Sequence, residues 1–212
     1  MAEARRGRAR LTRRRMVEAA YRLFSEQGYS VPLTAIAGEA GVAIQTIFFT
    51  FHTKQELLSE ALTLAVLGDE RPLAPHEREW FEAFAAEPDP RLAVGILVDN
   101  TQAIFERVAP LLGVFRTSDP DVAEMWRHSE DLRHEGYRKL VGTLAAKAPL
   151  KQGLTMALAT DALFALLSPD LYRLVSVERA WGPKRWSSWI KGVLSDALFG
   201  PLPVRRRRES SR

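Results

Sequence analysis

The sequence contains no cysteine among its 212 residues. This absence excludes disulfide frameworks, thiolate zinc sites, iron–sulfur clusters and cysteine nucleophiles, and it fits a reducing compartment. The chain also lacks the run of about 18 apolar residues that spans a bilayer, and its arginine-rich start lacks the apolar stretch of a secretory signal. With 46% hydrophobic residues it has enough apolar side chains for a buried core. We therefore expect a folded cytoplasmic protein that makes no contact with a membrane.

Signatures of common enzyme sites are also missing. There is no G-x-S-x-G nucleophile elbow, no phosphate-binding glycine loop and no H-E-x-x-H zinc motif. The array most similar to a metal site is Glu124, His128, Asp131 and Glu135, which would share one stripe of a helix. That stripe lies opposite an apolar face, which favours a solvated surface. We predict no catalytic residues, no metal and no cofactor, with a small enzyme hosted by the helical body kept as an alternative.

The net charge of +4 is unevenly distributed along the chain. Residues 1–15 carry seven arginines and one glutamate, a net +6, and residues 205–212 carry five arginines and one glutamate, a net +4. Residues 16–204 are therefore left with a net charge of −6. Basic ends on an acidic body are expected where the ends contact a polyanion such as a nucleic acid. For the C-terminal arginine run, a solvated tail is the simpler interpretation.

Helical periodicity dominates, and no segment alternates polar and apolar residues for long enough to predict a strand. Glycine and proline separate the periodic segments, and Thr12 is placed to cap the first one. The predicted fold class is all-α. Helices are expected over residues 12–27, 33–40, 44–50, 53–68, 77–86, 89–108, 119–147, 155–167, 170–180 and 183–199, with another short one between Pro110 and Pro120.

The N-terminal part has a pattern that is typical of DNA-binding proteins. A short helix over residues 33–40 is followed by a turn at Gly41 and a second short helix from about Ile44. After an amphipathic helix and a basic arm, this arrangement indicates a helix-turn-helix reader, whose second helix enters the major groove. Its first turn would present Ile44, Gln45 and Thr46 to the bases, and a glutamine can bond adenine with two hydrogen bonds.

Two further groups of cations extend this interface. Lys54 opens the next helix, where Thr53 and Glu56 form a capping box, and there it is directed toward the DNA backbone. Arg13 and Arg14 belong to the arginine-rich stretch of residues 5–15 and are expected to contact DNA.

Residues 12–58 resemble the DNA-binding domain of the tetracycline-repressor (TetR) family of transcriptional regulators. The matching pieces are V-E-A-A-Y-R-L-F-S-E-Q-G-Y (17–29), T-A-I-A-G-E-A-G-V-A (34–43) and T-I-F-F-T-F-H-T-K-Q-E-L-L (46–58). The resemblance implies a larger helical domain behind the reader that binds a small ligand and dimerises. It divides the chain into a basic flexible arm (1–11), a helix-turn-helix domain (12–58), a ligand-binding and dimerisation domain (59–200) and a basic tail (201–212).

The sequence departs from the family pattern in the recognition region. Ala43 stands where a hydroxyl residue usually caps the recognition helix, and Phe48 stands where a tyrosine hydroxyl usually meets a phosphate. Thr50 stands where an aromatic residue or histidine is usual. Either the arginines of residues 5–15 replace these contacts electrostatically, through the minor groove, or DNA binding is weak. Phe49 is expected either to touch thymine methyl groups or to belong to the core.

The rest of the chain resembles one subset of the family's C-terminal domains, through E-R-V-A-P-L-L (106–112) and S-P-D-L-Y-R-L-V (168–175). By that resemblance the helices over about 155–175 and 183–199 pair with their copies in a homodimer. The alternative is that their apolar stripe packs within one chain. The residues concerned are Leu158, Ala162, Ala165 and Leu166 on the first helix and Trp186, Trp189, Ile190 and Val193 on the second.

Aromatic and methionine side chains of the central helices are the candidates for a ligand pocket, although each is also suited to an ordinary core position. They predict a hydrophobic or aromatic effector. Asp161 is a further polar candidate that needs a partner if it is buried, and His134 has no assignable role. The predicted pocket residues are Trp80, Phe84, Asn100, Phe105, Phe115, Met125, Trp126, Tyr137 and Phe164.

The sequence therefore predicts a ligand-responsive DNA-binding regulator. We expect a repressor that is released from double-stranded operator DNA when its small effector binds. The alternative is a helical small-molecule-binding module with degenerate or weak DNA binding.

Overall fold

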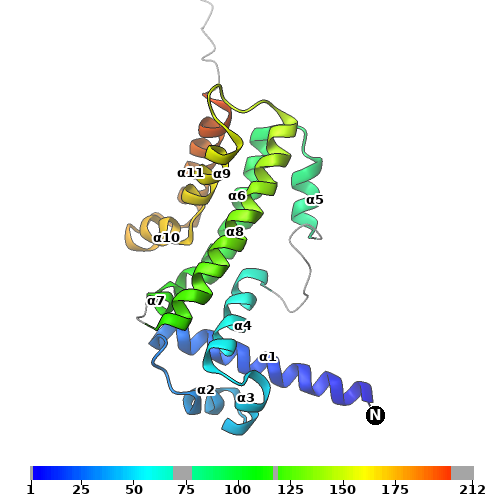
Figure 1. Cartoon of the computed structure of the whole chain (residues 1–212), viewed down its shortest axis with the longest axis vertical. Coiled ribbons are helices and arrows are strands. Elements are labelled where there is room, and N and C mark those ends of the chain that lie inside the picture. Colours follow the sequence, from blue (N-terminus) through cyan, green and yellow to red (C-terminus); the bar gives the residue numbers. More distant parts are fainter. Residues whose placement is uncertain (1, 69–77, 117–118, 202–212) are drawn as a thin grey trace, which may run out of the picture.

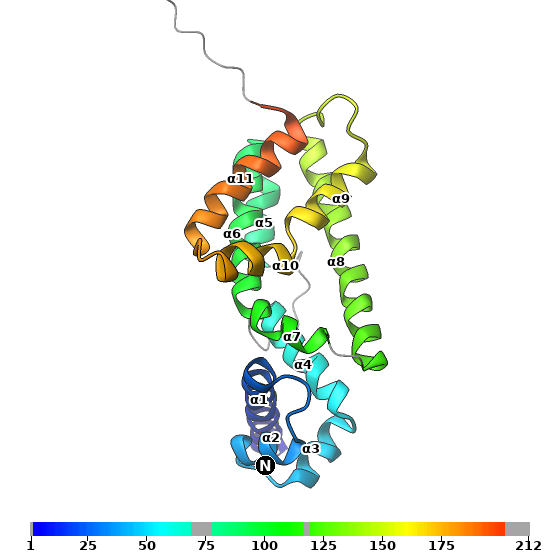
Figure 2. The same ribbon diagram turned by 90° about the vertical axis from the view of Figure 1, so that its left-hand side faces the viewer.

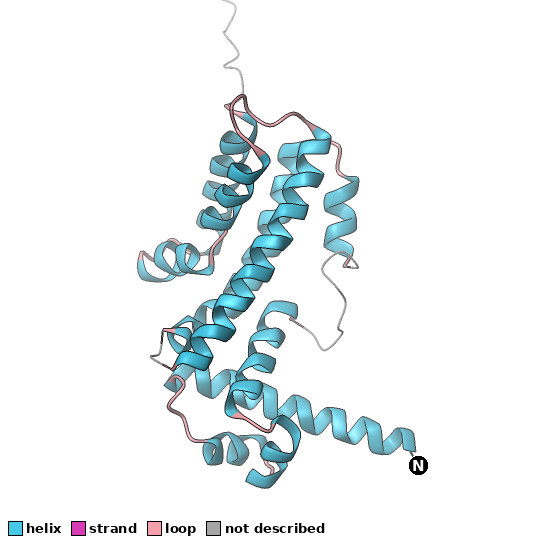
Figure 3. Ribbon diagram, in the orientation of Figure 1, coloured by secondary structure: helices cyan, strands magenta, loops and turns pink. Residues whose placement is uncertain are grey.

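The computed structural model describes residues 2–68, 78–116 and 119–201. Every regular element in these ranges is helical, which confirms the all-α prediction (Figure 3). The elements are α1 (Ala2–Gln27), α2 (Leu33–Ala40), α3 (Ile44–Phe51), α4 (Lys54–Leu67), α5 (Glu79–Ala86), α6 (Pro90–Val108), η2 (Ala109–Leu111), α7 (Leu112–Phe115), α8 (Pro120–Lys147), α9 (Met156–Leu166), α10 (Pro169–Tyr172), η3 (Arg173–Glu178) and α11 (Pro183–Phe199).

The helices form two parts that follow one another along the long axis of the molecule. Helices α1 to α4 form a small head at one end, and the others form a larger body in which α6 and α8 run lengthwise (Figures 1 and 2). In the body, α8 packs on α9, and α11 packs on both α6 and α9. Helix α4 starts in the head and also packs against α6 and α8, so it connects the two parts.

Helix α1 begins earlier in the chain than predicted. The arm predicted to be flexible over residues 1–11 is helical from Ala2 onward, and Thr12 lies inside α1 instead of at its first turn. Arginine and alanine are strong helix formers, and the single Gly7 costs only about 1 kcal/mol in a helix interior. The N-terminal half of α1 consequently projects away from the head as a rod (Figure 1). The basic tail falls mainly on residues 202–212, which lie outside the described residues.

Two hydrophobic clusters stabilise the molecule. The head cluster contains the buried faces of α1 to α4, for example Phe24, Ile36 and Leu57, each at most 1% exposed. It also includes body residues between Val108 and Val122, so the head core is completed by the body. The body cluster is formed by α5, α6, α8, α9 and α11. The domain boundaries drawn from the sequence stay predictions.

The sequence predicts no helix that spans a membrane. Within the described ranges no helix is by itself long and apolar enough to cross a bilayer. Helices α2 and α3 reach the length and composition only together, and they are bent by 103° relative to each other.

The bend between α2 and α3 depends on a glycine with positive φ. Gly41 has φ +65° and ψ +42°, and its N–H donates to carbonyl oxygens of α2. A side chain in this conformation costs about 1–2 kcal/mol. Gly38 lies inside the same helix with open space around its Cα, where alanine is the better helix former.

We predict opposite effects for two alanine substitutions in this helix. Gly41→Ala should lower the free energy of unfolding by about 1–2 kcal/mol, whereas Gly38→Ala should raise it by up to about 1 kcal/mol. Urea denaturation of both variants measures the difference. Equal effects would show that the turn does not need the left-handed conformation.

Candidate nucleic-acid interface

Helix α3 has one buried face and one exposed face. Ile47 and Phe51, four residues apart, are each 1% exposed and insert into the head cluster. Gln45, Phe48 and Phe49 lie on the other side and are exposed. Of the two aromatic side chains, Phe49 is 86% exposed and Phe48 is 50% exposed, so neither belongs to the core.

The polar residues of α3 have different surroundings. Ile44 and Thr46 are half-buried. The hydroxyl of Thr50 donates to the carbonyl oxygen of Thr46 at 2.7 Å, so it is used within the helix. Gln45 is thus the residue among the three predicted base readers whose side chain is exposed.

The start of α3 lacks a side-chain cap. Ala43 has the extended conformation of an N-cap residue, with φ −70° and ψ 146°, and makes no side-chain hydrogen bond. Helix α4 shows the opposite case, because the Thr53 hydroxyl accepts a hydrogen bond from the Glu56 N–H at 3.0 Å. This contact confirms the expected cap of α4.

Arg13 is turned toward the head. Its guanidinium lies 4.5 Å from the centre of the Phe51 ring and 2.8 Å from the Glu60 carboxylate, and it donates to the Thr50 carbonyl oxygen at 3.5 Å. Thr50 is in the last turn of α3, where the helix dipole favours a cation. Arg13 therefore joins α1 to the end of the recognition helix, in addition to any contact with DNA. Arg14 pairs with Glu18 on the surface of α1 at 2.7 Å.

Lys54 lies where α4 meets both the head and the body. Its ammonium group is 4.7 Å from the centre of the Tyr29 ring. Burial lowers the pKa of Lys54, and the charge of Asp119 partly opposes this shift. The neighbouring Gln55 amide donates to the Asp121 carbonyl oxygen at 2.9 Å, which joins the start of α4 to the first turn of α8.

Helix α1 carries further exposed arginines. The Arg15 guanidinium is close to the turn, 3.8 Å from the position that a Cβ of Gly41 would occupy. Arg6, Arg8 and Arg10 are exposed on the projecting half of α1. These exposed arginines make the projecting half of α1 a basic surface.

Arg107 of α6 connects the body to the head. Its Nε donates to the Ala65 carbonyl oxygen at 2.7 Å, and it also bonds the Val66 carbonyl oxygen, so it caps the last turn of α4. Its own carbonyl oxygen accepts a hydrogen bond from the Tyr21 hydroxyl of α1 at 2.8 Å. One body residue thus contacts two helices of the head.

The predicted pocket residues are distributed over the two hydrophobic clusters. Phe115, Met125 and Trp126 belong to the head cluster or pack against it, and the Phe115 and Trp126 rings stack at 4.5 Å. Trp80, Phe84, Phe105, Tyr137 and Phe164 belong to the body cluster or pack against it, and Asn100 is half-buried.

Two of these residues have structural contacts. The Tyr137 hydroxyl donates to the Leu167 carbonyl oxygen at 2.9 Å, and burial raises the pKa of Tyr137 to about 12. The Arg133 guanidinium lies 3.8 Å from the centre of the Phe164 ring and donates to the Phe164 and Leu167 carbonyl oxygens. These contacts fix the end of α9 on α8. Their assignment to a ligand stays a prediction.

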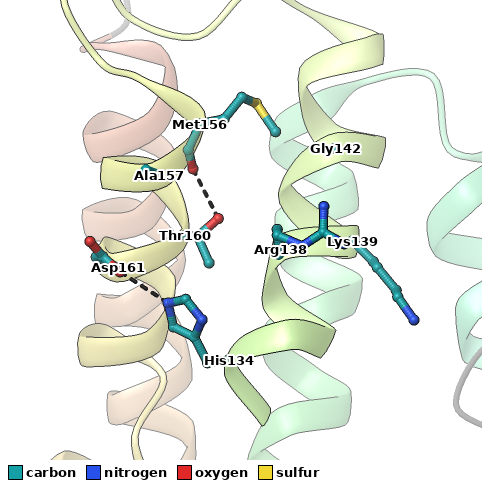
Figure 4. Close-up of a pocket in the computed structure, with 8 residues that line it drawn as sticks. All are labelled: His134, Arg138, Lys139, Gly142, Met156, Ala157, Thr160 and Asp161. Atoms are coloured by element: carbon teal, nitrogen blue, oxygen red, sulfur yellow. Dashed lines mark hydrogen bonds and ion pairs between the residues drawn. The ribbon is translucent and has the colours of Figure 1, made fainter. Parts of the chain in front are cut away.

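A half-open pocket of about 480 Å³ lies between α8 and α9 (Figure 4). His134 Nε2 and Asp161 Oδ1 are 3.0 Å apart at one end of it, so Asp161 is an exposed partner of His134. Sequence analysis missed this pocket because the pair is separated by 27 residues and no local pattern links the two. The lining residues are His134, Arg138, Lys139, Gly142, Met156, Ala157, Thr160 and Asp161.

The acidic and histidine stripe of α8 is exposed, with Glu124 and Glu135 paired to neighbouring arginines. Within the described ranges no three His, Asp or Glu side chains are placed to share a metal ion.

The apolar residues predicted for dimerisation are partly buried and partly exposed. Trp186 and Ile190 are fully buried within their own chain, as the alternative interpretation expected for the whole stripe. Trp189 of the same helix is 36% exposed, and Leu158 of α9 is 55% exposed.

We predict that a cap can be added to the recognition helix. Ala43→Ser should raise the free energy of unfolding by about 1 kcal/mol, because the new hydroxyl can accept a hydrogen bond from a free N–H in the first turn of α3. Ala83→Ser, at an exposed interior position of α5, should instead lower it slightly. Thermal or urea unfolding measures both, and no gain from Ala43→Ser would contradict the described geometry.

Comparisons with known proteins agree with this geometry. Residues 16–61 match the family model described as bacterial regulatory proteins, tetR family. No curated protein sequence matches the chain. Among solved structures, NalD from Pseudomonas aeruginosa is similar with a TM-score of 0.66 and 21% identity, over 89% of this chain and 95% of that chain.

Two ligand-bound structures are also similar. FadR from Bacillus subtilis, in complex with stearoyl-CoA, has a TM-score of 0.69 and 16% identity over 86% of this chain and 97% of that chain. A transcriptional regulator from Saccharomonospora viridis, in complex with choline, has a TM-score of 0.64 and 18% identity over 93% of this chain and 98% of that chain. At these identities the structures establish a common fold. The match to the tetR family model is confined to residues 16–61, which contain α2 and α3 of the head.

Proposed function

We propose that this protein is a transcriptional repressor that binds operator DNA through α3 and is released by a small effector bound in its body. The observation that carries this proposal is the exposed face of α3, which includes Gln45 and follows the turn at Gly41, on a head whose first helix carries exposed arginines. Enzymatic activity is not part of the proposal, since the family and the similar structures are regulators.

The similar proteins support the regulatory part of this proposal. NalD is the secondary repressor of the MexAB-OprM multidrug efflux pump. The FadR and Saccharomonospora regulators were found with stearoyl-CoA and choline, so small molecules bind proteins of this fold. For this chain we propose a site in the body. The pocket between α8 and α9 suits an effector with an apolar part beside Met156 and polar groups that bond His134, Thr160 or Asp161.

We further propose that the protein binds DNA as a homodimer through α9 and α11. Exposed apolar side chains on these helices and on η3 between them include Leu158, Leu174, Val177 and Trp189. A two-fold dimer would place two copies of α3 on one duplex about 34 Å apart, which suits a near-palindromic operator.

The effector signal has a route through α4. Helix α4 follows the reader directly, and its two ends are held by the body, through Gln55 at the start and Arg107 at the end. An effector that shifts α6 or α8 would therefore move α4 and the head. A coupling free energy of about 1–3 kcal/mol, or 5- to 150-fold in affinity, is typical of such regulators.

A DNA titration tests the proposed function. We predict that the full chain binds selected duplexes in a sequence-dependent and salt-sensitive way, and that Gln45→Ala weakens this binding by about 5- to 150-fold, as expected for a lost bidentate base contact of about 1–3 kcal/mol. Gln152→Ala, an exposed glutamine of the body, is the matched control and should leave affinity unchanged. Sequence-independent binding by the wild type would contradict the proposal.

A second titration tests the route through α4. Stearoyl-CoA and choline are suitable first probes, because they bind proteins of this fold. For whichever compound weakens DNA binding, Arg107→Lys should reduce that weakening several-fold, because the lysine ammonium is a compact point charge without the planar guanidinium fork that donates to the Ala65 and Val66 carbonyl oxygens from separate nitrogens. Arg127→Lys on the surface of α8 is the control. Unchanged coupling in Arg107→Lys would exclude this contact from the route.

One alternative function has observations in its favour. Ala43 leaves α3 without a cap, and Phe48 offers no hydroxyl to a phosphate. A protein that binds its small ligand but has lost specific DNA binding would show these features. In that case Gln45→Ala combined with Thr46→Ala would leave DNA affinity unchanged.

A further inference from the structure

The most exposed large apolar side chain in the described part of the protein is Phe49, at 86%. Leaving a phenylalanine in water forgoes the favourable free energy of its burial. The fold does not use Phe49, because Ile47 and Phe51 are the α3 residues that enter the head cluster. An apolar ring held in solvent beside a candidate ligand surface is consistent with a contact made in a complex.

Phe49 shares one stripe of α3 with the candidate base reader. Gln45, Phe48 and Phe49 are related by i, i+3 and i+4, so their side chains are neighbours on the helix surface. Phe48 is half exposed and widens the apolar part of this stripe. The stripe therefore joins one amide to two aromatic rings on the side away from the core.

The charges around the stripe indicate the kind of partner. Arg15 lies at the turn before α3, and exposed arginines follow along α1. Duplex DNA fits such a surface, because it can accept an apolar contact from the rings of the stripe and cations from the neighbouring arginines. Its phosphates are anionic, and the thymine C5-methyl is the apolar group among the base edges of the major groove.

We propose that Phe49, assisted by Phe48, contacts thymine methyl groups next to the base bonded by Gln45, and that it thereby determines operator specificity. This inference rests on the proposed DNA-binding function and adds a requirement for thymine at defined positions. It also gives Phe48 an apolar role at a position where a phosphate-binding hydroxyl is missing.

Replacing thymine by uracil tests the contact, because the exchange removes the methyl group and keeps base pairing. A duplex is first selected from a random pool with the full chain, and each thymidine in it is then replaced singly by deoxyuridine. We expect about fourfold weaker wild-type binding for each contacted methyl, from about 0.8 kcal/mol per buried carbon. Phe49→Ala should bind thymine and uracil duplexes equally.

Two controls make the result specific. Leu132→Ala removes another exposed apolar side chain, 61% exposed on α8, and should keep the thymine preference. Because Phe49 packs so little within the chain, the thermal unfolding of Phe49→Ala should match the wild type.

The outcomes separate this inference from the proposed function. Sequence-specific binding with no effect of uracil at any position, or an equal effect in Phe49→Ala, overturns the role of Phe49 and leaves the DNA-binding function intact. Absence of sequence-specific binding by the wild type overturns both. If Phe49→Ala instead abolishes self-association in sedimentation and leaves the thymine preference unchanged, the ring is a protein contact and the inference is wrong.

Discussion

The head and the body share one hydrophobic cluster. The buried faces of α1 and α4 are covered by body residues between Val108 and Val122, so the head core is complete only when the body packs on it. In addition, Arg107 caps α4 and Gln55 bonds the first turn of α8. Because packed cores deform in discrete steps and not continuously, a shift of α6 or α8 would be transmitted to the head under the proposed mechanism. The regulatory proposal depends on this shared packing.

The recognition region combines an uncapped helix with an apolar surface. Ala43 leaves the start of α3 without a side-chain acceptor, whereas Arg13 stabilises its end from α1. Phe48 and Phe49 direct aromatic rings outward, and the cations lie on α1 and at the turn. In the proposed complex, α3 would recognise bases and α1 would attract phosphates. This division explains how a head with few phosphate-binding hydroxyls remains suited to DNA.

Local sequence patterns predicted much of this arrangement. The turn at Gly41 and the cap at Thr53 follow from backbone chemistry within a few residues, and both are present. Contacts between distant segments were not predictable, because they depend on tertiary packing that no local spacing encodes. The contact of Arg13 with the Phe51 ring and the pairing of His134 with Asp161 of another helix are two examples. The aromatic pocket candidates were chosen by residue type, which does not distinguish a core position from a ligand contact.

The central claim is that the exposed face of α3 lies in the major groove. Because the chain has no cysteine, Gln45→Cys introduces a single thiol, which can carry a photo-crosslinking group. With the selected duplex bound at saturation, we predict cross-links from this position to bases at one or two defined steps in each half-site. Glu124→Cys on the exposed side of α8 should give none. Specific binding without cross-links from α3, or equal cross-linking from both positions, would contradict the account.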